Sequence, residues 1–154
     1  MRKRIEFRKA TREDALFVAE RLREADLKEV SALGLSPEEA VEHSRQISDY
    51  CRTALIDGVP AMLFGCGCSL CSSEAEVWAL GTDACSGVPR EMLIYGRRKL
   101  GEMLEMYPEM HNYCDARYKA ALRWLKKLGF TVHPEEPHGA NGELFCRITI
   151  CREA

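Results

Sequence analysis

The amino-acid sequence predicts a single α/β (α+β) domain, residues 1–154, with a mixed sheet and helices on both faces. A length of 154 residues and a hydrophobic content of 46% suffice for one sizeable core and are too small for two ordinary domains. Short apolar strands alternate along the chain with amphipathic helices, an order typical of helices packed on a sheet. No internal repeat, low-complexity tract or linker interrupts this order.

The charge balance points to no electrostatic partner. Charged residues make up 30% of the chain and nearly cancel, leaving a formal net charge of -2, so neither nucleic acid nor a membrane surface is expected as a partner. The basic start, residues 1–4, has no apolar stretch behind it, and no apolar run approaches the ~18 residues of a membrane span. We therefore expect a cytoplasmic protein whose eight cysteines are thiols.

The chain is predicted to begin with a strand and a helix. Residues 4–8 alternate charged and apolar side chains, which is the period of a half-buried strand. Thr11 and Asp14 have the spacing of a capping box, so a helix is expected to start after Thr11. Its apolar positions at helical spacing are Ala15, Leu16, Ala19 and Leu22.

A second helix is predicted over residues 37–47. Ser36 is a good N-cap, Pro37 suits the first helical position, and Glu39 is placed to return a bond to the cap. Between the two helices, residues 27–34 are expected to form at most a short helical turn.

Three strands are predicted in the middle of the chain. Residues 51–56 and 59–64 flank Asp57 and Gly58, whose tolerance of positive φ suits a two-residue hairpin turn. Residues 76–80 form the third of these strands.

A long helix follows the irregular stretch 81–89 and is predicted to end before Pro108. Its stripe of mostly apolar or small positions comprises Leu93, Gly96, Arg97, Leu100, Leu104 and Tyr107.

The C-terminal part is predicted to contain three strands and one helix. Residues 110–114 form a strand and residues 118–128 an amphipathic helix, which Gly129 ends in left-handed geometry. Residues 130–133 and 144–151 form the last two strands.

This order, together with the segment from Tyr118 to Phe130, resembles the GNAT superfamily of acyl-CoA-dependent N-acetyltransferases. The segment is similar to the family's Asn-x-x-Ala-x-x-x-Tyr-x-x-x-Gly-Phe helix, and Ala121, Gly129 and Phe130 match it. The resemblance implies a mostly antiparallel sheet whose fourth and fifth strands splay apart around acetyl-CoA. More narrowly, the Asp-Ala-Arg before the helix and the Gly-Phe-Thr-Val-His-Pro after it resemble GNAT-like internal virion (core) proteins of tailed phages.

Two positions depart from the family's pattern. The tyrosine that often protonates the departing CoA thiolate is replaced by Leu125, which cannot transfer a proton, and the asparagine position is Tyr118. The family's Gln/Arg-x-x-Gly-x-Gly/Ala loop, whose N–H groups cradle the pyrophosphate, is represented by residues 83–89. This loop keeps one glycine, Gly87, and gains the charge of Asp83.

The resemblance also implies where acyl-CoA and the catalytic groups lie. The backbone of residues 78–81 is expected to pair with the pantetheine amides, and residues 85–88 to face the pyrophosphate. The expected cofactor-binding residues are Trp78, Leu80, Gly81, Cys85, Ser86, Gly87, Val88 and Ala121. Glu76 is the expected general base, with Glu74 an equal candidate, and Tyr118 is the nearest hydroxyl for proton delivery.

Other residues allow alternatives that the sequence leaves open. Arg90, Arg97 and Arg98 either meet the phosphates or form a solvated helix face. His133 and His138 could line a substrate cleft, although a polar turn is preferred. Trp78, Trp124 and Phe130 are interpreted as core aromatics rather than ligand platforms.

Cysteine chemistry is a further alternative. Cys66, Cys68 and Cys71 have a spacing that could hold zinc, but no second ligand pair exists, so no metal is expected. Cys114 could be a nucleophile, yet His111, three residues away on the same strand, projects to the opposite face.

Three functions from different classes follow. The first is a GNAT-like enzyme that binds acetyl-CoA and transfers the acetyl group to an amine by direct attack. The second is a non-catalytic structural or interaction protein of a phage particle or prophage, which binds virion proteins; Leu125 and the altered loop favour it. The third is a zinc-binding module.

Overall fold

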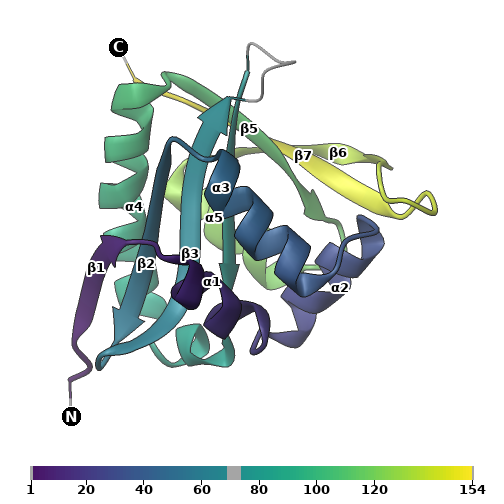
Figure 1. Cartoon of the computed structure of the whole chain (residues 1–154). Helices are drawn as coiled ribbons and strands as arrows, with labels where there is room; N and C mark the ends of the chain where they lie inside the picture. The colour runs from purple at the N-terminus through teal and green to yellow at the C-terminus, as the bar shows by residue number, and fades with distance from the viewer. Residues whose placement is uncertain (1, 69–73, 154) are drawn as a thin grey trace.

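A seven-stranded sheet forms the centre of the structure, and helices cover both of its faces (Figure 1). The computed structural model describes residues 2–68 and 74–153. The strands are β1 (Ile5–Lys9), β2 (Tyr50–Ile56), β3 (Val59–Cys68), β4 (Ala75–Gly81), β5 (Glu109–Asp115), β6 (Thr131–Pro137) and β7 (Leu144–Cys151). Their order is β1-β2-β3-β4-β5-β7-β6, and among these described strands β4 and β5 are the one parallel pair of neighbours. The predicted fold class, a mixed and mostly antiparallel sheet between helices, is confirmed.

Two core clusters separate the helices into two layers. The helices are α1 (Arg12–Ala19), α2 (Glu24–Ala32), the π-helix η1 (Glu39–His43), α3 (Ser44–Ile47), the 3-10 helix η2 (Asp83–Gly87), α4 (Pro89–Met106) and α5 (Lys119–Leu128). Val18 of α1 and Val41 of η1 pack with Leu63 of β3 on one face of the sheet. Phe64, next along β3, points to the other face and packs in the cluster that contains Leu100 of α4. None of the helices in residues 2–68 and 74–153 has the length and apolar composition of a membrane span.

Local signals in the sequence are confirmed at several element ends. The Thr11 hydroxyl accepts a hydrogen bond of 3.1 Å from the amide of Asp14, whose carboxylate accepts from the Thr11 amide. The predicted helix over residues 37–47 is present, with η1 in its middle. The hairpin turn has positive φ at both central residues, 50° at Asp57 and 81° at Gly58.

Helix α2 differs from the prediction. Only a short helical turn over residues 27–34 was expected, whereas the chain is α-helical from Glu24 to Ala32. The inward face of α2 carries Asp26 beside Val30, and both side chains are buried. A buried carboxylate interrupts the apolar stripe by which a helix is recognised in a sequence.

Two strands extend by four residues beyond their predicted ends. β3 continues four residues beyond the expected end at residue 64, because its last residues pair with β4. β6 continues to Pro137 instead of ending at His133. It lies at the edge of the sheet, where Pro134 need not donate to a ladder and the glutamates that follow are exposed. Gly129 ends α5 with φ of 111°, as predicted.

Candidate functional site

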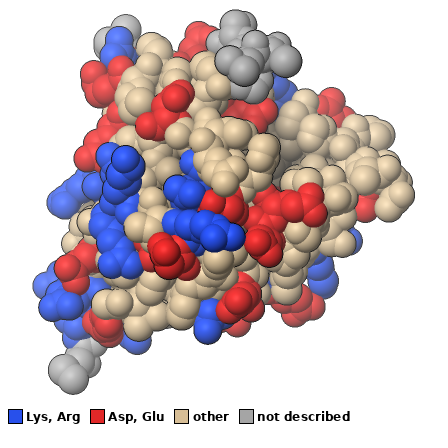
Figure 2. Space-filling view, viewed as in Figure 1, with Lys and Arg blue, Asp and Glu red and all other residues tan. Residues whose placement is uncertain are grey.

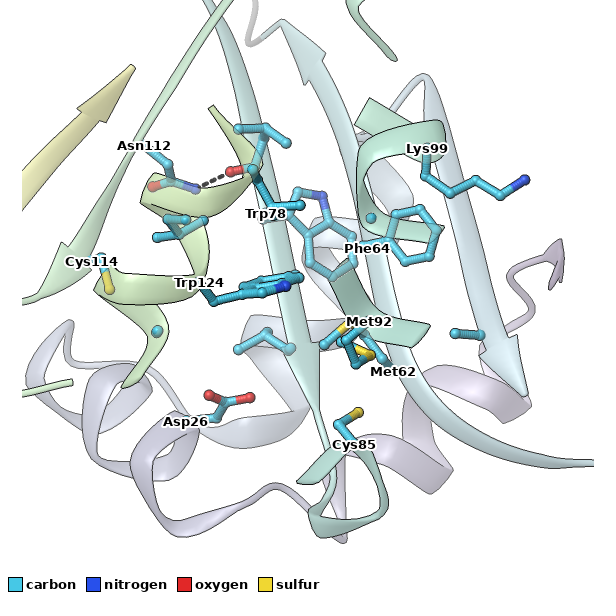
Figure 3. Close-up of a pocket in the computed structure, with 18 of the residues that line it drawn as sticks. Asp26, Met62, Phe64, Trp78, Cys85, Met92, Lys99, Asn112, Cys114 and Trp124 are labelled. Atoms are coloured by element: carbon cyan, nitrogen blue, oxygen red, sulfur yellow. Dashed lines mark hydrogen bonds between the residues drawn. The ribbon is translucent and has the colours of Figure 1, made fainter. Parts of the chain in front are cut away.

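The two parallel strands of the sheet part soon after they begin. β4 and β5 are paired only at Ala75 with Met110 and at Glu76 with His111. One residue further on, the side-chain amide of Asn112 donates a hydrogen bond of 2.6 Å to the carbonyl of Val77, bridging the strands (Figure 3). Beyond this bridge no strand pairing joins β4 to β5 in the described residues, so the splay expected from the resemblance is present.

The main chain of β4 presents one free pair of polar groups to this gap. Because N–H and C=O groups alternate sides along an antiparallel ladder, residues 77, 79 and 81 all face away from β3. The carbonyl of Val77 is bound by Asn112, while the N–H of Gly81 donates to Asp26 and its carbonyl accepts from Arg23. The N–H and C=O of Ala79 remain, in the middle of the gap, and make no hydrogen bond across it within residues 2–68 and 74–153.

A pocket of about 500 Å³ passes through the gap and joins the two faces of the sheet. Ligand pockets are typically of this size and mostly apolar. On one side its walls come from α2 and the 37–47 helix, and on the other from α4 and α5. Figure 3 shows Trp78 and Trp124 together with Met62, Met92 and Phe64 around it. The gap is therefore open space and is not filled by its own side chains.

Glu29 of α2 brings a carboxylate into this pocket, and the sequence did not point to it. Its Oε2 accepts a hydrogen bond of 3.0 Å from the amide of Asp115, at the end of β5. Burial raises the pKa of Glu29 to about 7, and the neighbouring carboxylates of Asp26 and Asp115 act in the same direction. A carboxylate with such a pKa can take a proton near neutral pH. Because residues 27–34 were predicted as a turn, no pattern placed residue 29 beside β5.

The raised pKa makes a prediction about stability. The ordinary value is 4.5, so between 4.5 and about 7 the folded chain holds a proton that the unfolded chain has lost. Stability therefore falls as the pH rises through this window. Glutamine at position 29 can still accept from Asp115, so Glu29→Gln is expected to stabilise the protein above neutral pH by roughly 3 kcal/mol. Urea denaturation at several pH values checks this. The gain in free energy of unfolding of Glu29→Gln over the unchanged protein should grow up to about pH 7 and then stay constant. A gain that does not depend on pH would contradict the raised pKa of Glu29.

Asp26 forms a second polar centre at the far end of the gap. Its carboxylate accepts a hydrogen bond of 2.7 Å from the Gly81 amide and hydrogen bonds of 3.2 Å from the Arg23 guanidinium. The Arg23 guanidinium also lies 5.8 Å from the centre of the Tyr118 ring. Burial, followed by the charge of Asp26, raises the pKa of the Tyr118 hydroxyl. Tyr118 therefore lines the pocket as a protonated hydroxyl, as a proton donor must be.

The α5 side of the pocket carries an unused donor. Trp124 was interpreted as a core aromatic, but it lies in the pocket wall beside Ala121 and Leu125. Its indole Nε1 is buried and has no hydrogen-bond partner among the described residues. A buried donor normally has a partner, so this N–H can donate to a bound molecule. Leu125 lines the same wall and offers no polar atom in place of the family's tyrosine.

The predicted pyrophosphate loop forms the compact 3-10 helix η2. Cys85 and Val88 are buried and bond within the turn: the Cys85 amide donates to Thr82 and the Val88 amide to Cys85. Ser86 and Gly87 are exposed and remain the parts of the loop that can face a ligand, and Asp83 is exposed as well.

Two of the three α4 arginines have partners within the structure. Arg97 donates a hydrogen bond of 3.1 Å to the carbonyl of Lys127 at the end of α5. Arg98 lies over the ring of Tyr95. Arg90, exposed at the start of α4, is the arginine nearest the loop in sequence that could meet phosphates.

The remaining sequence candidates fall into two groups. Glu76 lines the pocket but is exposed, whereas Glu74 pairs with His111 and Arg147 outside the pocket lining. Phe130 is a buried core aromatic, as predicted, although it too reaches the pocket wall.

His133 and His138, for which the sequence left the lining of a substrate cleft open beside the preferred polar turn, lie outside the pocket. His133 belongs to β6 rather than to a turn, and its Nε2 lies 2.9 Å from the hydroxyl of Thr149. His138 stacks on Tyr113 with ring centres 3.6 Å apart. Neither histidine lines the pocket between β4 and β5.

The cysteines give no catalytic or metal site in the part of the chain that is described. Cys66 is buried and Cys68 is part-exposed, both as free thiols, while Cys71 lies outside the described residues. No group of metal-binding side chains occurs within residues 2–68 and 74–153. Cys114 lies in the pocket wall, where burial and the Glu29 carboxylate raise the pKa of its thiol and keep it protonated.

Comparison with known proteins supplies structural neighbours. No protein-family model and no curated protein matches the sequence. The chain is similar to yncA, a putative acetyltransferase from Salmonella typhimurium with its cofactor acetyl-CoA, with a TM-score of 0.66, 14% identity and coverage of 98% of this chain and 95% of that one. It is also similar to an acetyltransferase (GNAT family) from Bacillus anthracis, with a TM-score of 0.70, 11% identity and coverage of 96% and 95%.

A third similar structure is the aminoglycoside acetyltransferase AAC(6')-Ib in complex with coenzyme A. Its TM-score is 0.66 at 16% identity, with coverage of 97% of this chain and 95% of that one. Identities this low speak for the fold, and over nearly the whole chain that fold is the one of the GNAT acetyltransferases.

Proposed function

We propose that this protein binds an acyl-CoA, with acetyl-CoA as the first to test, in the gap between β4 and β5 and transfers the acyl group to an amine. The observation that carries the proposal is the position of Glu29, a carboxylate with a pKa of about 7 in the wall of a pocket that passes through this gap. The similar folds determined with acetyl-CoA or coenzyme A support the choice of ligand.

The residues of the gap fit a pantetheine chain. The N–H and C=O of Ala79 can pair with its amides as a further strand would, flanked by Trp78 and Leu80. The indole N–H of Trp124 supplies another donor. The small side chain of Ala121 leaves room for the ligand beside α5. Gly81 contributes through Asp26, because its own amide is taken by that carboxylate. Ser86 and Gly87 would face the phosphates.

The chemistry is a direct displacement. Glu29 takes a proton from the ammonium group of the acceptor, and the freed nitrogen attacks the thioester carbonyl. A C–N bond forms, the C–S bond breaks, and the CoA thiolate leaves with the bonding pair. The nitrogen loses its second proton as the amide forms, and this proton replaces the one that Tyr118 gives to the thiolate, while the proton on Glu29 passes to water. Tyr118, which stays protonated at neutral pH, is the hydroxyl in the pocket that can return a proton to the thiolate. The products are an amide and free CoA.

The test is release of the CoA thiol from acetyl-CoA in the presence of primary amines. We expect amine-dependent release whose rate rises with pH and levels off above about pH 7, as Glu29 loses its proton. Release that does not depend on the amine, or a rate that is flat through this pH range, would contradict the role of Glu29.

A non-catalytic role is the second candidate. The compact η2 turn, with its buried Cys85 and Val88, and the apolar Leu125 both favour it. In that case the protein is a structural or interaction protein of phage or prophage origin that has kept the fold, and it works in the virion rather than in the cytoplasm. It would then co-purify with particles and release no CoA.

A further inference from the structure

We infer that the acceptor is a primary amine carried on an apolar body, with a single positive charge. This inference rests on the proposed function and names the class of acceptor for the same pocket.

The entrance to the pocket on the α2 side is apolar although it faces solvent. Leu33, Leu35 and Ile47 all line the pocket, and their exposed fractions are 36%, 41% and 51%. They come from the end of α2, the loop after it and the end of α3. Three exposed large apolar side chains around one entrance indicate contact with an apolar ligand.

The apolar wall continues inward to a fixed aromatic ring. Val30 and Ala40 also line the pocket and are buried, and Trp78 packs against the core cluster to which they belong. The indole of Trp78 is held by a hydrogen bond of 2.7 Å from Nε1 to the hydroxyl of Ser48. A ring fixed in this way offers a flat apolar surface to the body of a ligand.

On the α2 side, where the apolar entrance lies, the carboxylates of the pocket suit one ammonium group. Asp26 is already paired with Arg23 and with the Gly81 amide, and Glu76 is exposed. On the α2 side of the pocket Glu29 therefore remains as the part-buried carboxylate that no cation pairs with among the described residues. The other part-buried carboxylate of the lining, Glu91, belongs to the first turn of α4 on the opposite side.

The acidic side chains outside the pocket do not change this conclusion. Glu38, Glu39 and Glu42 of the 37–47 helix line a separate depression. On the face drawn in Figure 2, acidic and basic side chains lie interspersed, with uncharged surface between them. A polyamine or an aminoglycoside carries several ammonium groups, so this pocket would leave most of them unpaired beside leucines.

The experiment follows amine binding and acetyl-CoA binding separately. The chain has two tryptophans, and both line the pocket, so their indole N–H signals report on ligands there. In the absence of acetyl-CoA, we expect 2-phenylethylamine to bind at least about tenfold more tightly than ethanolamine, as measured by the shift of the Trp78 indole signal. The reason is that burying the phenyl ring removes apolar surface from water. Kanamycin and spermidine are expected to bind more weakly than 2-phenylethylamine.

The matched variants are Leu33→Ser with Leu35→Ser, and Leu27→Ser as the control. Leu27 is 40% exposed on the same helix but does not line the pocket. The double variant should lose the preference for 2-phenylethylamine by about tenfold or more. Leu27→Ser should keep it, and acetyl-CoA affinity should be unchanged in both.

Two outcomes would overturn the inference: equal binding of ethanolamine and 2-phenylethylamine, or tighter binding of kanamycin or spermidine. If acetyl-CoA binds while apolar amines are not preferred, only this inference fails. If apolar amines bind but acetyl-CoA does not, the proposed function fails and the acceptor role falls with it.

Discussion

Replacing Glu29 with glutamine is expected to lower the rate of acyl transfer by roughly 100- to 10,000-fold, the usual effect of removing a general base. Glutamine has nearly the same shape and can still accept from the Asp115 amide, but it cannot take a proton. Acetyl-CoA affinity should therefore stay the same, and the loss should appear in kcat rather than in cofactor binding. Steady-state kinetics above neutral pH, together with a calorimetric titration of acetyl-CoA, measure both quantities.

Glu76→Gln is the matched control for this variant. Glu76 lines the same pocket and was the base expected from the sequence, but it is exposed. We expect it to keep most of the activity. If Glu76→Gln loses the activity and Glu29→Gln keeps it, the sequence-based choice is right and the assignment of Glu29 is wrong.

Replacing Ala121 with phenylalanine is expected to abolish acetyl-CoA binding. Ala121 is half-buried on the inner side of α5 and lines the pocket, so a larger side chain there projects into the space meant for pantetheine. The pocket is open at this position, and the added ring should therefore fill it without displacing the core. Calorimetry with acetyl-CoA, and thermal denaturation to confirm the fold, check the two parts of the prediction.

Arg123→Phe provides the control for the Ala121 variant. It introduces the same side chain on the same helix, at an exposed position that does not line the pocket. Acetyl-CoA should bind to it as tightly as to the unchanged protein. Equal loss of binding in both variants would mean that α5 is merely disturbed, and undiminished binding by Ala121→Phe would place the ligand elsewhere.

Much of the fold could be predicted because local signals agree with the tertiary structure. The capping pair at Thr11 and Asp14, the hairpin turn at Asp57 and Gly58, and the C-terminal Gly129 each specify backbone geometry within a few residues. The splay of β4 from β5 followed from the family resemblance and not from any local pattern.

The site was harder to predict because long-range contacts create it. Asp26 is buried on α2 since it binds the amide of Gly81, a residue far along the chain, and the sequence shows only a polar residue there. Glu29 gains its raised pKa from the same helix lying against the end of β5. The free main-chain groups of Ala79 depend on the register between β3 and β4.

The most direct measurement of the central claim is hydrogen exchange at the amide of Ala79, followed residue by residue by NMR with and without acetyl-CoA. Its N–H faces the gap, whereas the N–H of the next residue, Leu80, is directed toward β3 by the alternation of the ladder. If pantetheine pairs with β4, acetyl-CoA should slow exchange at Ala79 far more than at Leu80, and adenosine 3',5'-bisphosphate, which lacks pantetheine, should not. Unchanged exchange at Ala79 with saturating acetyl-CoA would contradict the claim that acyl-CoA lies between β4 and β5.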